Sequence, residues 1–163
     1  MYDNKRNIKD TADDTKGEEV NQYVTFLVGD ETYGVSVMKV QSLNEMIEIT
    51  HVPKARAFIK GVINLRGSVI PVIDMRRKFS LPPKEYDSFT VILIVEVNER
   101  LVGMIVDAVS DVVNIPLSDI QSQINYSARV DTSSIEGIGR IGESLVVLLD
   151  VETFLAGDSL TEG

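Results

Sequence analysis

The chain of 163 residues carries 16 basic and 25 acidic side chains, a formal net charge of −9, with 44% hydrophobic residues and no cysteine. This length suits one compact domain or two small fused ones, and the apolar content is too high for a disordered chain. The acidic balance argues against general nucleic-acid binding, and the lack of cysteine excludes disulfides, thiolate metal sites and cysteine nucleophiles.

The first twenty residues carry four basic and six acidic side chains and few apolar ones, a composition that predicts a disordered leader over residues 1–20. The chain contains no apolar run of about 18 residues, so we expect no direct membrane insertion. Its N-terminus also lacks the apolar stretch of a secretory signal. Together these features predict a cytoplasmic protein.

Strand-like alternation and closely spaced turn residues predict four β-hairpins along the rest of the chain. They are expected at residues 23–29 with 33–37, 61–65 with 68–73, 88–97 with 101–106, and 135–140 with 144–149. Two short helices are expected at Met75–Phe79 and Val151–Leu155, where Asp74 and Asp150 are better explained as N-caps than as ligands. This pattern predicts an all-β protein of the barrel or sandwich class.

These hairpins recur in the same order, which indicates an internal repeat. Residues 33–37, followed by valine and leucine at 40 and 43, align with residues 102–106, followed by valines at 109 and 112, at an offset of 69. The later hairpins at residues 61–74 and 137–150 share glycine, serine and terminal aspartate positions at an offset of 76. We infer a duplication into two related half-domains of about five strands each. The alternative is that any two β-hairpins look alike.

Charge is unevenly distributed: residues 51–84 contain eight basic side chains and one acidic, whereas residues 85–163 contain fourteen acidic and three basic. Such asymmetry suits electrostatic steering of protein partners, although folding could bring the two segments together and cancel both fields. Binding of RNA by the basic segment is less favoured, because Phe58 and Phe79 are too few aromatics for a stacking platform.

Catalytic chemistry finds little support in the sequence. The only histidine, His51, stands beside Val52-Pro53 and is interpreted as an ordinary loop residue. No phosphate-binding loop or dinucleotide-binding fingerprint is present, and nothing identifies a pair of catalytic carboxylates. The sequence therefore favours a protein that is not an enzyme.

The chain closely resembles the chemotaxis coupling proteins of the CheW family in three segments: YGVSVMKVQSL, FIKGVINLRGSVIPVIDMRRKF and VGMIVDAVSDVV. The resemblance runs from about residue 22 to about residue 155, and the pattern G-V-x-N-L-R-G-x-V-x-P-V-x-D is complete from Gly61 to Asp74. It implies two SH3-like five-stranded β-barrel subdomains packed around a shared core, with short helices. The expected domain spans residues 21–157, with halves at roughly 21–86 and 87–157, consecutive or intertwined, and a C-terminal tail at 158–163.

This resemblance implies a non-enzymatic adaptor without cofactors or metals. It would couple the cytoplasmic domains of chemoreceptors (methyl-accepting chemotaxis proteins) to the CheW-like regulatory domain of the histidine kinase CheA. It would act at membrane-associated receptor arrays. The alternative is a CheW-like scaffold for a parallel chemosensory pathway that does not control motility.

Five positions match family positions used in receptor binding. Val40, Val109 and Val112 match residues that line a groove for a helical receptor hairpin, the alternative being that all three are core residues. Arg66 matches an exposed hairpin-tip arginine used in coupling, the alternative being a solvated turn charge. Gly61 matches a position where a larger side chain would disturb the groove, the alternative being a purely structural role.

Ser42 departs from the family pattern, because many members carry an acidic residue there. The following Asn44-Glu45-Met46 departs as well. These differences leave open how the Val40 side of the groove recognises a receptor, so Ser42 is not carried over as a site.

Overall fold

The computed structural model describes residues 20–55, 58–122, 130 and 132–156. The leader predicted at residues 1–20 therefore lies outside the described residues except for Val20, which begins the first strand, and so does the tail at 158–163. No helix in the described part is long and apolar enough to cross a membrane. The elements in chain order are β1 (Val20–Val28), β2 (Glu31–Ser36), the 3-10 helix η1 (Val37–Lys39), β3 (Val40–Glu45), β4 (Ile59–Leu65), β5 (Ser68–Asp74), α2 (Met75–Lys78), β6 (Val91–Val97), β7 (Arg100–Val106), β8 (Ala108–Pro116), η2 (Leu117–Asp119), β9 (Ile120–Gln121), η3 (Thr132–Ser134), β10 (Ile135–Ile141), β11 (Ser144–Leu149) and α3 (Val151–Phe154).

The predicted hairpins and helix caps are present. Asp74 and Asp150 accept hydrogen bonds from the second and third backbone amides after them, as N-caps do. One strand begins later than predicted: β6 starts at Val91 rather than at Ser88. The reason is local, because the Asp87 side chain accepts hydrogen bonds from the Phe89 amide and the Thr90 hydroxyl and holds this stretch in a turn.

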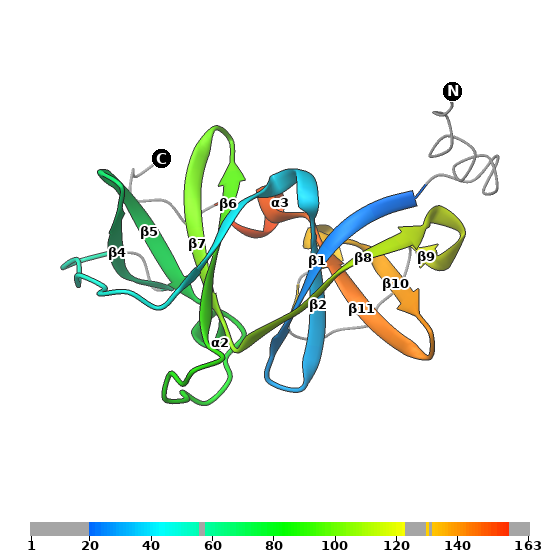
Figure 1. The fold of residues 1–163 in the computed structure, drawn as a ribbon, viewed down its shortest axis with the longest axis horizontal. Helices are drawn as coiled ribbons and strands as arrows, with labels where there is room; N and C mark the ends of the chain where they lie inside the picture. The colour runs from blue at the N-terminus through cyan, green and yellow to red at the C-terminus, as the bar shows by residue number, and fades with distance from the viewer. Residues whose placement is uncertain (1–19, 56–57, 123–129, 131, 157–163) are drawn as a thin grey trace, which may run out of the picture.

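The strands form two sheets, and each sheet combines strands from both halves of the chain (Figure 1). The middle of the chain forms a five-stranded sheet in the order β3-β6-β7-β5-β4, and both ends of the chain form a six-stranded sheet in the order β8-β1-β2-β11-β10-β9. Neither sheet corresponds to residues 21–86 or 87–157, because β3 leaves β2 to pair with β6 and β8 leaves β7 to pair with β1. The two SH3-like subdomains are therefore intertwined: one contains β1 and β2 together with β8–β11, and the other contains β3–β5 together with β6 and β7.

Strand register repeats between the two sheets. Gly34 of β2 pairs in parallel with Leu148 of β11, and Gly103 of β7 pairs in parallel with Val72 of β5. These two pairs are related by the offsets of 69 and 76 seen in the sequence. Any two hairpins can share similar side chains. It is less expected that the β2–β11 pair and the β7–β5 pair, each formed by strands distant in the chain, also share the same parallel register. The strand register therefore follows the same repeat as the sequence.

The β-bulges also repeat, at two pairs of positions. Gln41 on β3 and Ser110 on β8 are the extra residues where these strands meet β6 and β1. Lys60 on β4 and Glu136 on β10 are the extra residues opposite β5 and β11. A bulge bends its strand and strengthens the local twist, so both subdomains curve at the same places.

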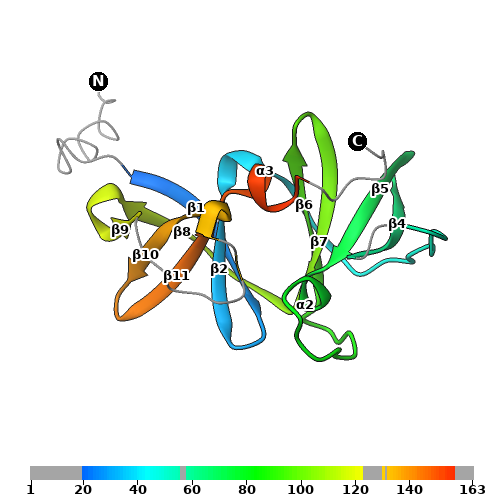
Figure 2. The same cartoon turned by 180° about the vertical axis from the view of Figure 1, so that it is seen from behind.

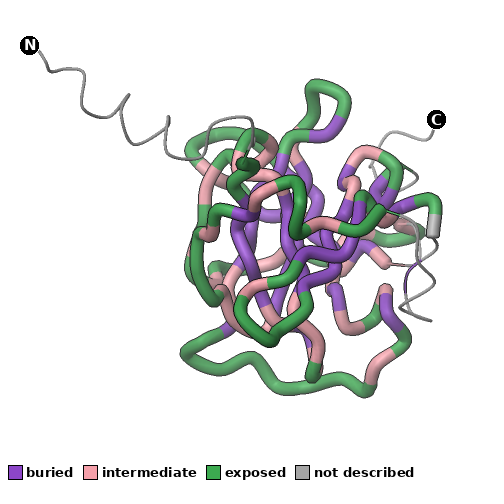
Figure 3. Tube along the Cα trace, turned by 90° about the vertical axis from the view of Figure 1, so that its right-hand side faces the viewer, coloured by how far each residue is buried: buried purple, intermediate pink, exposed green. Residues whose placement is uncertain are grey.

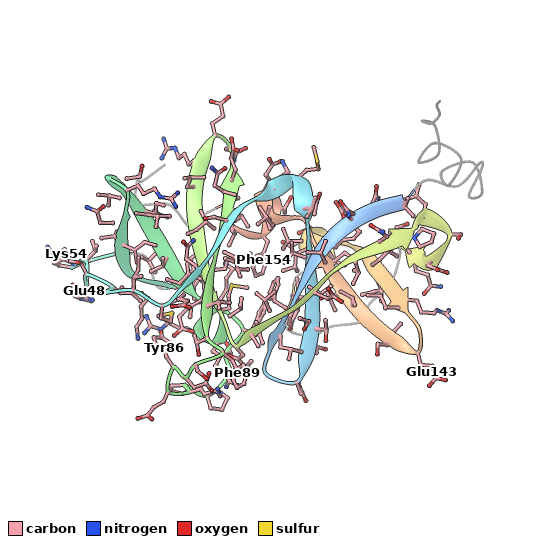
Figure 4. All side chains as sticks on the ribbon, in the orientation of Figure 1. Glu48, Lys54, Tyr86, Phe89, Glu143 and Phe154 are labelled. Atoms are coloured by element: carbon pink, nitrogen blue, oxygen red, sulfur yellow. The ribbon has the colours of Figure 1, made fainter. Side chains whose placement is uncertain are left out.

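Three hydrophobic cores follow from this arrangement. Each subdomain has its own small interior, one around Ile70, Ile92 and Ile94 and the other around Tyr23 and Leu148. A larger third core is shared between the two sheets, and the buried strands of Figure 3 run through it. Stacked or tilted aromatic rings cross it in the order Phe26, Tyr33, Phe79, Phe154. Figure 4 shows Phe154 at the centre of the molecule, where α3 meets both sheets.

Candidate functional site

The two crossing strands, β3 and β8, lie at the edges of their sheets and carry apolar side chains at matching places. We define the β3–β8 surface as Val40 and Leu43 on β3 together with Val109 and Val112 on β8. Each residue on β3 has its counterpart on β8 at the offset of 69. The surface is therefore built from both halves of the repeat.

Strand pairing orients the inner pair of this surface. Val40 pairs with Val95 and Val109 pairs with Phe26, and both partners are buried in the shared core. Directly paired residues on neighbouring strands point to the same face of a sheet, so both valines face the shared core. Each is only partly buried and packs against the rim of that core. They are neither fully buried core residues nor free surface residues.

The outer pair is more exposed. Leu43 pairs with Leu93 and Val112 pairs with Val24, again on the face of the shared core, yet Leu43 is 47% exposed and Val112 is 52% exposed. The core alternative is wrong for Val112. Sequence reasoning passed over Leu43 as a site, although its offset of 69 from Val112 was the signal that could have identified it.

Ser42 lies on the other face of β3. It pairs with Ile94, whose side chain belongs to the interior of the subdomain, and its hydroxyl accepts a hydrogen bond of 2.9 Å from the Asn44 side-chain amide. The two departures from the family pattern are thus in contact with each other. Neither side chain points to the same face as Val40 and Leu43.

Arg66 lies at the tip of the β4–β5 hairpin, exposed to solvent. Arg66 and Gly67 both have positive φ, 52° and 88°, as a two-residue type I′ turn requires, and the Gly67 amide donates to the Asn64 side chain at 3.0 Å. In the order of strands, β4 is the edge opposite to β3. The structure therefore presents Arg66 outward but does not place it on β3 or β8.

Gly61 is buried beside the bulge of β4. A Cβ atom here would come within 2.3 Å of the Thr50 carbonyl oxygen, because Thr50 and Val62 bridge the strand through two hydrogen bonds of 2.8 Å. Gly137, its counterpart in the repeat, has the Ile120 side chain and the Gln121 carbonyl oxygen at 2.6 and 3.0 Å. A side chain at Gly61 would push apart the segments that close its subdomain.

An ion pair lies at each crossing. Arg76 of α2 donates from Nε and Nη2 to the Asp107 carboxylate at 2.9–3.2 Å, where β7 passes into β8. Lys39 of η1, where β2 passes into β3, pairs with Glu152 of α3 at 2.5 Å. These hydrogen bonds raise the pKa of Arg76 and that of Lys39.

The charge asymmetry of the sequence is partly cancelled by folding. Arg76, from the basic segment, pairs with Asp107 of the acidic one, and Lys84 pairs with Asp87 at 2.7 Å. The latter contact lowers the pKa of Asp87 to about 2. The net basic field expected over residues 51–84 is reduced accordingly.

In the described part of the chain, two open cavities are lined by residues other than the four of the β3–β8 surface. One of about 340 Å³ is lined by charged side chains of both signs around Tyr86, whose pKa burial raises to about 12. The other, of about 590 Å³, lies at η1 and the β6–β7 turn. Among the described residues, no group of three or more His, Cys, Asp or Glu side chains could hold a metal ion. His51 is exposed in a loop.

Comparisons with known proteins agree on one family. Residues 22–158 match the CheW-like domain. The chain is 34% identical to the chemotaxis protein CheW of Klebsiella aerogenes, over 92% of this chain and 91% of that protein. It is 35% identical to the chemotaxis protein CheW of Bacillus subtilis, over 91% and 94%. The crystal structure of the scaffolding protein TtCheW from Thermoanaerobacter tengcongensis superposes with a TM-score of 0.75 and 31% identity, covering 80% of this chain and 89% of that one.

Proposed function

The chain belongs to the CheW family of chemotaxis scaffold proteins, and on this premise we propose that it couples the cytoplasmic domains of chemoreceptors to the histidine kinase CheA. It does so by binding both partners and without chemistry of its own. It acts in the cytoplasm at membrane-associated receptor arrays.

One observation supports receptor binding at the β3–β8 surface: two partly buried valines are flanked by two exposed aliphatic side chains on strands from both halves of the repeat. Apolar residues on one face of a helix fit such a surface, with affinity coming from the apolar area they bury. Because these four side chains pair with residues of the shared core, a receptor helix bound here would contact both subdomains together.

CheA carries a domain similar to this one, and we expect that domain to pair with surfaces away from β3 and β8. Binding of both partners by one adaptor raises their effective concentration, so individually modest contacts can sustain an array. Control of the kinase then requires that the adaptor binds the active and inactive arrangements with different affinities.

A reconstitution tests this function. The full chain is mixed with a receptor cytoplasmic fragment, with CheA, and with both, and complexes are separated by size while kinase activity is measured. We expect two binary complexes, one ternary complex, and kinase activity that depends on receptor only when the adaptor is present. A chain that binds neither partner, or only one, contradicts the proposal.

A further inference from the structure

An ion pair lies at each of the two crossings between the sheets, and the two pairs have opposite polarity. Glu152 is the repeat counterpart of Arg76, since both stand two residues after a capping aspartate and are related by the offset of 76. Arg76 binds Asp107 where β7 passes into β8, and Glu152 binds Lys39 where β2 passes into β3. In Figures 1 and 2, α2 and α3 lie at opposite ends of the junction between the sheets, so one ion pair stands at each end.

At the α2 end, Asp107 makes hydrogen bonds to residues next to both sheets. Its carboxylate accepts from Arg76, next to the five-stranded sheet, and also from the Gly29 amide, in the β1–β2 turn of the six-stranded sheet, at 2.8 Å. Its own amide donates to the Leu27 carbonyl at 3.0 Å. Both members of the pair are about four-fifths buried, 20% and 19% exposed, so solvent screens this contact weakly.

At the α3 end, Lys78 of α2 lies 4.9 Å from the Phe154 ring, but the position equivalent to Asp107 carries no carboxylate. Met38 stands at the position equivalent to Asp107, and its side chain is 86% exposed and cannot replace a carboxylate as acceptor. An open cavity of about 590 Å³, lined by Met38, Glu152 and the Gly29 counterpart Asn98, lies there instead. Lys39 and Glu152 are 40% and 42% exposed, and an ion pair as exposed as this contributes little.

We infer that Asp107 is a positioning residue that fixes the β8 side of the β3–β8 surface against both sheets, whereas the β3 side is held loosely and adjusts when a helix binds. Val109 follows Asp107 by two residues, so a shift of this crossing moves the inner valine on β8 directly. Val40 follows Lys39 immediately, but breaking the exposed ion pair between Lys39 and Glu152 costs little free energy, so this crossing can shift. The functional part of this inference rests on the proposed function.

Two measurements test it on the full chain. Because the chain has no cysteine, Gln41→Cys and Ser110→Cys place one spin label on the exposed bulge residue of β3 and one on that of β8. Pulsed electron resonance then reports the distribution of distances between the two strands. Affinity for a receptor cytoplasmic fragment is measured by calorimetry on the unlabelled variants.

Asp107→Asn keeps an acceptor for the Gly29 amide but removes the charge that binds Arg76. We expect it to broaden the distance distribution and to weaken receptor binding about tenfold. Glu152→Gln should weaken binding by about twofold or less, and the double reversal Lys39→Glu with Glu152→Lys should restore the wild-type value. Lys84→Gln is the matched control: its ion pair with Asp87 is as exposed as that of Lys39 with Glu152, at 41% and 46%, and Lys84 lines one cavity with Arg76 and Asp107. The control therefore tests whether loss of any charge near this crossing has the same effect.

If Asp107→Asn does not fold, Arg76→Lys tests the same ion pair, since it keeps the positive charge but loses the bidentate hydrogen bonds to Asp107. A distance distribution and receptor affinity equal to wild type in the folded variant would overturn the inference, and so would an equal loss in the Lys84→Gln control. Failure of the wild-type chain to bind the receptor fragment would instead count against the proposed function, whatever the spin labels report.

Discussion

Leu43 on β3 and Val112 on β8 are separated by 69 residues in the chain and occupy the same place in two sheets. Leu43 pairs with Leu93 and Val112 with Val24, and these partners are themselves 69 residues apart. About half of each side chain is exposed, on the same face as the shared core. Pairing with β6 and with β1, respectively, thus places these two residues at equivalent positions in the two sheets.

Leu43→Ser and Val112→Ser should each weaken binding of a receptor cytoplasmic fragment by several-fold, about 1 kcal/mol, because each removes apolar area that the bound helix would cover. The melting temperature should change little, since both side chains already meet water. Calorimetric titration and thermal melts measure the two effects. Leu145→Ser is the matched control, because Leu145 is 45% exposed on β11 and lies outside the surface. Equal loss of binding in that variant would contradict the assignment.

Val40→Thr and Val109→Thr test the inner pair, which is partly buried at the rim of the shared core. Each change should cost about 1 kcal/mol of stability, because part of the new hydroxyl loses water without gaining a partner. In addition to this loss of stability, the affinity for the receptor fragment should fall several-fold, while the affinity for CheA should change less. Unfolding of either single variant would show that the position is core, and parallel losses of receptor and CheA binding would argue against a specific receptor surface.

Arg66→Glu should weaken kinase activation in the reconstituted complex while changing stability by about 0–1 kcal/mol, because a solvated hairpin-tip charge has few folded-state contacts. Activation by the variant is compared with that by Arg140→Glu, a reversal on an exposed residue of β10. Normal activation by Arg66→Glu, or equal loss in both variants, would leave Arg66 as an ordinary turn residue.

Gly61→Ala should destabilise the protein by roughly 3 kcal/mol, because the added methyl group meets the Thr50 backbone, which cannot move without opening the subdomain. Gly137→Ala should cost less, about 1–2 kcal/mol, since its nearest neighbour is a side-chain methyl group, Ile120 Cγ2 at 2.6 Å, and the nearest backbone atom is 3.0 Å away. Denaturant unfolding measures both. If Gly61→Ala abolishes receptor binding without loss of stability, the close contact with Thr50 is not the reason for the glycine.

The ion pair between Asp87 and Lys84 should make a small contribution to stability that is lost in acid. Its pKa in the folded chain is lowered from 3.8 to about 2, first by the hydrogen bond from Lys84. A carboxyl group with a depressed folded-state pKa stabilises the protein above its unfolded value, and this contribution is lost as the pH falls from about 4 to 2. Lys84→Gln should flatten the fall of melting temperature over that window and leave receptor binding unchanged. A profile identical to wild type would mean that the pair does not persist in solution.

Local rules were sufficient for much of this fold. Turn residues and alternation predicted the four hairpins, because two strands joined by a short turn have little choice of partner or register. The capping aspartates at 74 and 150 followed from the same local chemistry, and the offsets of 69 and 76 identified the repeat. The late start of β6 was missed because the Asp87 side chain competes for backbone groups that a strand would use.

Three features were decided only by tertiary structure. The pairing of β3 with β6 and of β8 with β1 joins strands that are distant in the chain, and no turn specifies it. This pairing sets which faces of Leu43 and Val112 are exposed. The requirement for Gly61 comes from Thr50, eleven residues away and held there by the closing of the subdomain. The sequence alone identified a β protein with an internal repeat and a resemblance to the CheW family, because turns, alternation and matching segments can all be seen without knowing the tertiary contacts. Where its two halves meet, and how firmly Asp107 holds them, depended on contacts between residues that only folding brings together.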